Sequence, residues 1–305
     1  MPNAKFDRPF PALTPEQRLY LEIYGYVVVP GVLTPDECAS IKTALHRLRD
    51  DARKAAAPTN AHVHGARVFC SEFHTTYMAL TDVDPAFAHY TSHPRLVGMV
   101  EELIGGEARV TEVDAHVNSR DPKQAVDPAP TFGFHTGTDV AFGAHFRNGL
   151  MHCNFAKTLT TLNDLGPDDG GTVVIAGSHK IDAPAEQLVA CAYKDRSLIH
   201  QFIAPAGSTL LFSETLIHAT GVVRSQNERA IVITGYSPTM YMEWRNGTHA
   251  HSPLDERFAS SVPDELKALF FGKQVWTRGP RYRTLDQPAD SRAIEPVKWT
   301  PKTRM

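Results

Sequence analysis

Two histidines that lie far apart in the chain, His135 and His218, have the surroundings of metal ligands. His135 opens the sequence His135-Thr136-Gly137. Two histidines and one carboxylate commonly hold Fe(II), and the first histidine and the carboxylate are then two residues apart on one strand. Glycine occupies the carboxylate position here. We therefore predict an iron site with two protein ligands, in which an exogenous anion such as chloride binds at the third position.

Asp139 is the nearest acid that could replace the missing carboxylate. A strand expected around Phe134 to Asp139 would place His135, Gly137 and Asp139 on one face. Residues four apart on an extended strand are separated by roughly 13 Å. Asp139 would therefore reach the metal only if a bulge or turn intervened, and this alternative stays open.

Arg229 follows His218 by eleven residues and begins the next expected strand. A buried guanidinium needs an anion, and a carboxylate matches its fork of donors. Thr220 could donate its hydroxyl to the same carboxylate. The alternative for Arg229 is an internal salt bridge with Glu214 or Glu228.

Composition argues against nucleic acid polymers and membranes as partners. The formal charge of the 305 residues is −3, and 42% of them are hydrophobic. Such a chain can bury a core but has no strong field for polyanions. The four cysteines show neither zinc spacing nor a disulfide pattern, and no segment resembles a signal peptide or a membrane span. We expect a cytoplasmic protein that acts on a small molecule, and the sequence leaves its oligomeric state open.

The element pattern predicts one domain over 1–305 in three parts. Helical signals, such as the capping sequences that begin at Thr14 and Thr34, predict a helical front end over 14–107. Short β-rich runs between Gly, Pro, Asn and Asp turns, among them strands expected from Arg109 to Asn118 and from Leu150 to Leu162, predict an all-β sandwich or barrel over 108–238. The polar, proline-rich remainder, 239–305, is expected to wrap around it, with one helix near Pro263 to Phe271.

The chain resembles the phytanoyl-CoA dioxygenase family of Fe(II)- and 2-oxoglutarate-dependent oxygenases. The resemblance rests on Gly25 to Leu33, on Leu162-Asn163-Asp164, on the turn from Asp168 to Lys180, and on the spacing of His218, Thr220 and Arg229. It covers about Ile23 to Pro238. It implies a double-stranded β-helix, or jelly roll, with a helical segment before it, so the fold class is mainly β with flanking helices.

The resemblance also implies roles for single residues. His135 and His218 match the iron ligands, and Arg229 matches the residue that binds the distal carboxylate of 2-oxoglutarate, with Thr220 in support. Asn118 is expected to line the same pocket. The histidine of Gly177-Ser178-His179-Lys180 matches a structural turn. Two further residues, His152 and Asn154, are candidates for substrate contact.

Gly137 is the departure from the family pattern that bears on function. Family halogenases have glycine or alanine in place of the acid, so the resemblance implies a chlorinating enzyme that uses Fe(II), 2-oxoglutarate, chloride and O₂ in a ferryl-chloride radical mechanism. The alternatives are a hydroxylase that uses Asp139 or an exogenous ligand, and a non-catalytic jelly-roll binding protein.

The expected substrate is a small molecule of natural product biosynthesis. Similarity to nucleotide halogenases makes adenine deoxynucleotides one candidate class. Several arginines could bind a phosphate, although such residues are more commonly solvated on the surface. They are Arg120, Arg147, Arg245, Arg278, Arg281 and Arg283.

Overall fold

The computed structural model describes residues 12–123, 125, 127–147, 149–241 and 254–273. Its main feature is an antiparallel sheet of eight strands in the order β1-β11-β8-β13-β5-β4-β3-β2. In chain order these are β1 (Tyr26–Val29), β2 (Ala61–Val63), β3 (Ala66–Cys70), β4 (His74–Met78), β5 (Ala108–Asn118), β8 (Ala156–Thr161), β11 (Thr209–Ser213) and β13 (Arg229–Pro238).

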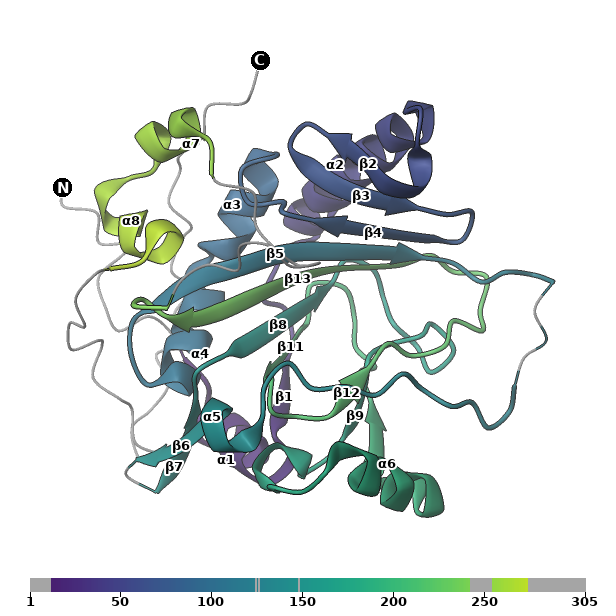
Figure 1. Ribbon diagram of the computed structural model, residues 1–305, viewed down its shortest axis with the longest axis vertical. Helices are drawn as coiled ribbons and strands as arrows, with labels where there is room; N and C mark the ends of the chain where they lie inside the picture. Colours follow the sequence, from purple (N-terminus) through teal and green to yellow (C-terminus); the bar gives the residue numbers. More distant parts are fainter. Residues whose placement is uncertain (1–11, 124, 126, 148, 242–253, 274–305) are drawn as a thin grey trace.

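A smaller sheet faces the central strands of the large one, and together they form the expected jelly roll (Figure 1). Its order is β10-β9-β12, with β9 (Val173–Ile175), β10 (Ile199–Gln201) and β12 (His218–Ala219). An isolated antiparallel bridge between His135 and His218 adds one more residue to this sheet. A separate hairpin joins β6 (Ala144–Arg147) to β7 (Leu150–Cys153).

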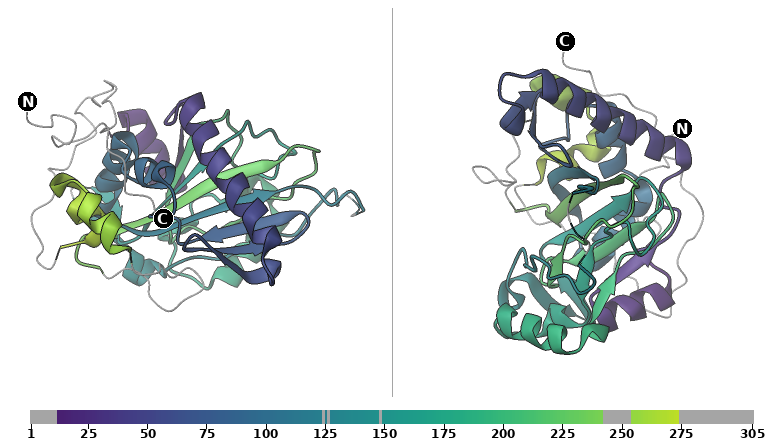
Figure 2. Two further views of the ribbon diagram at one scale, coloured as in Figure 1. Left: turned by 90° about the horizontal axis from the view of Figure 1, so that it is seen from above. Right: turned by 90° about the vertical axis from the view of Figure 1, so that its right-hand side faces the viewer.

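Three helices cover the outer face of the large sheet: α2 (Pro35–Lys54), α3 (Pro85–Thr91) and α4 (Pro94–Ile104) (Figure 2). The remaining helices are α1 (Pro15–Tyr24), which contacts β1, α5 (Val140–Gly143), α6 (Ala185–Lys194), which contacts β9, α7 (Glu256–Ser261) and α8 (Asp264–Phe271), which contacts β5. Three short 3-10 turns are η2 (Pro58–Asn60), η3 (Ser178–Lys180) and η4 (Arg196–Leu198).

Helix starts agree with the sequence prediction. Thr14 and Thr34 cap α1 and α2, and each forms the reciprocal capping box with the residue three positions on, Gln17 or Glu37. Proline follows each cap at the first helical position, where its missing N–H costs nothing. The helix expected near Pro263 is α8.

Side chains of β5 alternate between the two sides of the large sheet. Val113, Ala115 and Val117 belong to the main hydrophobic core, which the helices cover. Glu112, Asp114 and His116 point to the other side and line a cavity between the sheets. The two-residue period of the strand therefore separates an apolar outer face from a polar inner face.

Three expectations about strands were wrong or incomplete. The strand expected over Phe134 to Asp139 is only the single bridge at His135, because the N–H groups of Gly137 and Thr138 both donate to the carbonyl of Glu214 and the chain turns there. The run from Leu150 to Leu162 is two strands, β7 and β8. The front end, expected as mainly helical, also contributes β2, β3 and β4 to the large sheet.

All four cysteines are free thiols. Within the described residues, no helix combines the length and apolar character needed to cross a bilayer.

Candidate active site

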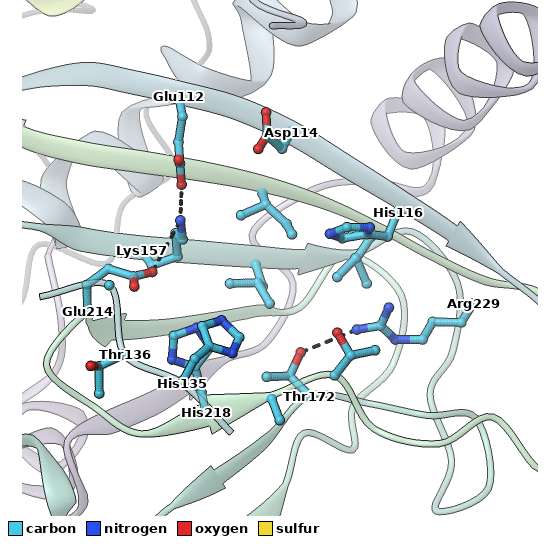
Figure 3. Close-up of a pocket in the computed structure, with 16 residues that line it drawn as sticks. Glu112, Asp114, His116, His135, Thr136, Lys157, Thr172, Glu214, His218 and Arg229 are labelled. Carbon is cyan, nitrogen blue, oxygen red and sulfur yellow. Dashed lines mark hydrogen bonds and ion pairs between the residues drawn. The ribbon is translucent and has the colours of Figure 1, made fainter. Parts of the chain in front are cut away.

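His135 and His218 are neighbours at the centre of the cavity. Each donates its backbone N–H to the carbonyl of the other at 3.0 Å, and their ring centroids are 4.3 Å apart. Figure 3 shows both rings pointing into the space between the sheets. The structure thus brings together two side chains that are 83 positions apart in the sequence (218 − 135).

Each ring is held so that its Nε2 atom is available as a ligand. The Nδ1 atom of His135 lies 3.0 Å from the carbonyl oxygen of Gly133, and that of His218 lies 2.9 Å from the carbonyl oxygen of Leu216. A carbonyl oxygen can only accept, so Nδ1 carries the proton and Nε2 keeps its lone pair. Burial lowers the pKa of His218, which outweighs the opposing charge of Glu214 and keeps this ring neutral.

Arg229 lies to one side of the histidine pair and is only 1% exposed. Its Nη2 donates to the hydroxyl of Thr172 at 3.4 Å, whereas its Nε and Nη1 have no hydrogen-bond partner among the described residues. Burial lowers the pKa of Arg229 to about 10, so the side chain is still a cation at neutral pH. A buried cation with two unused donors requires an anionic ligand.

The alternative of an internal salt bridge for Arg229 is wrong for both candidate acids. Glu214 makes its ion pair with Lys157, whose Nζ lies 3.2 Å from Oε1 of Glu214. Glu228 makes ion pairs with His46 at 2.7 Å and Arg49 at 3.1 Å.

Thr220 and Asn118 differ in their positions. Thr220 lines the same cavity as Arg229 and the two histidines. Asn118 lies directly opposite Arg229 in the β5–β13 register but lines a neighbouring cavity of about 470 Å³, which shares Thr220 and His116 with the first. Asn118 therefore lies beside the cavity of Arg229, and its role in that pocket stays a prediction.

The cavity that contains the histidines and Arg229 has a volume of about 360 Å³, within the usual range for small-molecule sites. Leu159, Ile231 and Ile233 give it an apolar wall. Figure 3 shows the polar groups in three places: Arg229 and Thr172 on one side, the histidine pair in the middle, and a charged group on the other side.

That charged group contains Glu112, Lys157 and Glu214. Lys157 forms a close ion pair with Glu112 and contacts Glu214, and both carboxylates are almost completely buried. Burial is the largest single effect and raises the pKa of Glu214, but the charge and hydrogen bond of Lys157, together with the neighbouring His218 and His135, outweigh it, so the pKa lies below its usual value. Glu214 is therefore an ionised carboxylate beside the histidine pair.

Gly137 and Glu214 occupy overlapping space. The N–H of Gly137 donates to the carbonyl of Glu214 at 2.9 Å. A Cβ atom added to Gly137 would lie 2.0 Å from Oε2 of Glu214. Glu214 in this position therefore excludes any side chain at position 137, including the aspartate of the usual iron site.

Asp139 does not reach the histidine pair. Its backbone stands at the N-cap of the short helix α5. Asp139 lines a separate cavity, together with Asp182 and Leu188, and does not line the cavity that contains His135. Within the residues that the structure describes, no group of three or more His, Cys, Asp or Glu side chains is arranged to hold a metal ion.

The candidate substrate contacts His152 and Asn154 lie outside this cavity. His152 is 2% exposed, and its Nδ1 lies 3.2 Å from the carbonyl oxygen of Glu102. Asn154 donates its side-chain amide to the carbonyl of Phe142 at 2.6 Å. Both side chains contact the backbone of neighbouring elements and neither lines the cavity of His135, so their contact with substrate stays a prediction.

His179 has the structural position expected of it. It lies in the turn η3, is fully buried, and its ring packs against Gly25.

The cavity residues that were not identified from the sequence include Glu112, Asp114, Lys157, Thr172 and Glu214. For the first two a signal existed, because Glu112, Asp114, His116 and Asn118 alternate with apolar residues and so predict a polar inner face for one strand. The position of Glu214 beside Gly137 depends on a turn between distant segments, which no local pattern reveals.

The residues present fit iron and 2-oxoglutarate. Two imidazole Nε2 atoms are suited to a divalent transition metal. The unused donors of Arg229, in the same cavity, are suited to a carboxylate of a dianion that reaches the metal with its other end.

Comparison with solved structures supports the fold. HygX from Streptomyces hygroscopicus with nickel and 2-oxoglutarate bound aligns with a TM-score of 0.59 and 23% identity, over 77% of this chain and 91% of that chain. The carbocyclase SnoK and the epimerase SnoN of nogalamycin biosynthesis, both described as non-heme and α-ketoglutarate dependent, align at 17% identity with TM-scores of 0.56 and 0.53. The alignment with SnoK covers 81% of this chain and 96% of SnoK. The alignment with SnoN covers 74% of this chain and 83% of SnoN.

None of the curated proteins matches the chain. The family model of phytanoyl-CoA dioxygenase (PhyH), by contrast, matches residues 21–231, which is more than half of the 305 residues and includes the histidine pair and Arg229. The chain therefore belongs to the phytanoyl-CoA dioxygenase family of iron- and 2-oxoglutarate-dependent oxygenases.

Proposed function

We propose that this enzyme chlorinates an unactivated C–H bond of a small molecule. The observation that carries the proposal is Gly137, which places no side chain beside the histidine pair where the usual iron site has a carboxylate. Asp139, the acid that could have replaced it, lines a different cavity.

Each role in the reaction has a residue suited to it. His135 and His218 would hold iron through Nε2, and Arg229 with Thr220 would hold the distal carboxylate of 2-oxoglutarate. Bound iron and 2-oxoglutarate would supply the oxidising equivalents from O₂: one oxygen atom would enter succinate as CO₂ is released, the other would leave as water with the substrate hydrogen and a proton, and chloride would supply the chlorine. The apolar wall of Leu159, Ile231 and Ile233 keeps water from the reacting C–H bond.

Lys157 has a role in this proposal through Glu214. Chloride can bind beside the histidines only if the carboxylate of Glu214 stays directed toward Lys157, because two anions at one position repel each other. The ion pair between these two side chains supports that arrangement.

Hydroxylation is the second candidate outcome, and one observation favours it. The carboxylate of Glu214 lies where a side chain of residue 137 would begin, 2.0 Å from the position of its Cβ. A change of Glu214 rotamer would let this oxygen become the third iron ligand, supplied from a different position of the chain. The two candidates differ only in which anion completes the iron site.

Glu214→Ala separates the two candidates. If chloride completes the site, the variant binds Fe(II) with a dissociation constant within about threefold of wild type and still forms a chlorinated product. If Glu214 is a ligand, iron affinity falls by ~10- to 100-fold, as expected for loss of a metal-site residue. Anaerobic titration and product mass spectrometry with and without chloride give the readouts, and Glu186→Ala, an exposed glutamate on α6, is the matched control.

A complementary variant must change two residues. Gly137→Asp alone would collide with Glu214, so the informative protein is Gly137→Asp with Glu214→Ala. We expect the double variant to bind iron and to lose chlorination, with hydroxylated product in its place. Continued chloride-dependent chlorination by the double variant would contradict the proposed site.

The non-catalytic alternative has no comparable support. A jelly roll that only bound another molecule would not need a fully buried arginine with two unused donors beside two ligand-ready histidines.

Natural products are the proposed substrate class. One HygX structure contains nickel, 2-oxoglutarate and hygromycin B, and SnoK and SnoN belong to nogalamycin biosynthesis. For adenine deoxynucleotides, neither of the two candidate phosphate arginines that the structure describes lines the cavity of the histidine pair. Arg120 lines the neighbouring cavity, Arg147 lies on β6, and four others, Arg245, Arg278, Arg281 and Arg283, lie outside the described residues.

A further inference from the structure

The segment Leu162-Asn163-Asp164, which belongs to the family pattern, follows β8 directly and lies beside the start of β13. The ladder between β8 and β13 ends at the pair of Thr161 and Ile231. Arg229 lies two residues beyond that pair, at the first position of β13. The backbone around Arg229 therefore needs other hydrogen-bond partners on the side of β8.

The side-chain amide of Asn163 provides these partners. Its Nδ2 donates to the carbonyl of Glu228 at 2.7 Å, and its Oδ1 accepts the N–H of Ala230 at 2.8 Å. Glu228 and Ala230 are the residues immediately before and after Arg229. Alternate residues of a strand direct their backbone groups to the same neighbour, so one planar amide takes the place of a paired strand residue here.

Arg229 is thus held from two sides at the point where its side chain enters the cavity. On the other side its backbone lies opposite Asn118 of β5. Asn163 is in turn fixed by the hydroxyl of Thr161, which donates to the carbonyl of Asn163 at 2.5 Å. Asn163 is not among the described residues that line the cavity of Arg229. Any influence of Asn163 on a ligand in that cavity therefore acts through Arg229.

Glu228 has a second anchor, which is weaker. Its carboxylate pairs with His46 at 2.7 Å and with Arg49 at 3.1 Å, both on α2. The side chains of Glu228 and His46 are 36% and 37% exposed, so solvent screens this attraction. The hydrogen bonds of Asn163 are partly buried and hold both neighbours of Arg229, whereas the ion pairs hold one.

We propose that Asn163 is a positioning residue for Arg229. Its amide fixes the backbone from which the guanidinium projects, and so directs the guanidinium donors at the carboxylate of 2-oxoglutarate. Recognition of a carboxylate by a guanidinium depends on geometry as well as charge, because a rotation of the planar group breaks one of its paired hydrogen bonds. The inference rests on the proposed role of Arg229 in holding 2-oxoglutarate.

A double-mutant cycle tests the inference. Calorimetry on the full chain loaded with Ni(II) measures the dissociation constant of 2-oxoglutarate. Asn163→Ala should raise this constant ~3- to 10-fold, the range for loss of one hydrogen bond's net contribution. In Arg229→Lys, which has no fork of donors to orient, the same substitution should change the constant less than about twofold.

Asp164→Ala is the matched control, because its carboxylate accepts the N–H of Ala206 and fixes the same loop away from Arg229. This variant should change the dissociation constant less than about twofold, even where its free energy of unfolding falls as much as that of Asn163→Ala. Urea unfolding compares the two stabilities, and the Ni(II) affinity of both variants should equal that of wild type. If Asn163→Ala does not fold, Asn163→Asp takes its place with the same expectations, since it keeps the acceptor for Ala230 and removes the donor for Glu228.

Equal weakening of 2-oxoglutarate binding by Asn163→Ala in both backgrounds overturns the inference, because Asn163 would then act by another route. A loss no larger than that in Asp164→Ala, or a parallel loss of Ni(II) affinity, also overturns it. The proposed role of Arg229 fails separately: it is refuted if Arg229→Lys alone leaves 2-oxoglutarate affinity unchanged. Weaker binding in Arg229→Lys without any effect of Asn163→Ala refutes only the positioning.

Discussion

The guanidinium of Arg229 is almost completely enclosed by the fold. It contacts Thr172 weakly and has two nitrogens without partners among the described residues. Lysine at this position would keep the charge but lose the fork of donors that matches a carboxylate.

We therefore expect Arg229→Lys to raise the dissociation constant of 2-oxoglutarate by ~10- to 100-fold, within the range for loss of a buried charge-assisted pair. Calorimetry on the Ni(II)-loaded protein measures it. Thr172→Val is the control, because its hydrogen bond of 3.4 Å is long, and it should change the constant less than fivefold or so. Unchanged 2-oxoglutarate affinity in Arg229→Lys would mean that the dianion binds elsewhere.

At this scale the sequence allowed two histidines and an arginine to be predicted as residues of one cavity, because their types and spacing are those of a known site. The surroundings of Gly137 could not be predicted. The sequence has glycine at position 137, where the usual site has a carboxylate, yet the turn after β11 places Glu214 against it. A side chain that lies beside a residue of a distant segment can be recognised only when the fold brings the two together.

Among the elements, helix α1 and the turn η3 meet at a single tight contact. Gly25 ends α1 with a φ of 82°, in the left-handed region, and a Cβ there would lie 2.3 Å from Nδ1 of His179. The same position also leads directly into β1, which pairs with β11 at the edge of the large sheet.

Gly25→Ala should therefore destabilise the protein by more than the conformational cost alone. The left-handed conformation costs an alanine about 1–2 kcal/mol, and displacement of the His179 ring adds to it. Gly31→Ala is the matched control, since Gly31 also has a positive φ, 60°, but nothing within 4 Å of the added Cβ. Urea unfolding should show a larger loss for Gly25→Ala; equal losses would show that the contact with His179 is not rigid.

Strand β5 shows what patterns along one element can and cannot predict. The bounds of β5 agree closely with the strand expected from Arg109 to Asn118. The alternation of polar and apolar residues along β5 also predicts which of its side chains face the cavity and which face the core. The segment around His135 was expected to be a strand because its residues alternate. Gly133 and Gly137 allow a turn there, and the chain turns because the N–H groups of Gly137 and Thr138 both donate to the carbonyl of Glu214.

On the scale of the whole molecule, the helices and turns that cover the sheet bury some histidines in their neutral form. Burial lowers the pKa of His152 and of His179 to about 4 each. His152 lies between β7 and the end of α4, where it contacts the carbonyl of Glu102, and His179 lies beneath the end of α1. Both rings are therefore neutral in the folded protein at pH values where an unfolded histidine is already protonated.

This difference predicts loss of stability in mild acid. Unfolded histidine titrates near about 6.5, so between that pH and about 4 the unfolded chain binds protons that the folded chain does not. Stability is therefore complete above pH ~6.5, falls by up to about 1.4 kcal/mol per pH unit for each histidine as the pH decreases, and levels off for these groups below pH ~4.

His179→Gln should lower the slope of unfolding free energy against pH in this window by about one proton, whatever its effect on stability at pH 7. Urea unfolding at several pH values measures the slope. His62→Gln, at an exposed position on β2, controls for loss of a histidine as such. Because the slope depends only on the protons bound in the two states, an unchanged slope in His179→Gln would show that the buried ring takes up its proton without unfolding, and that the contact between α1 and η3 opens in acid while the rest of the jelly roll stays folded.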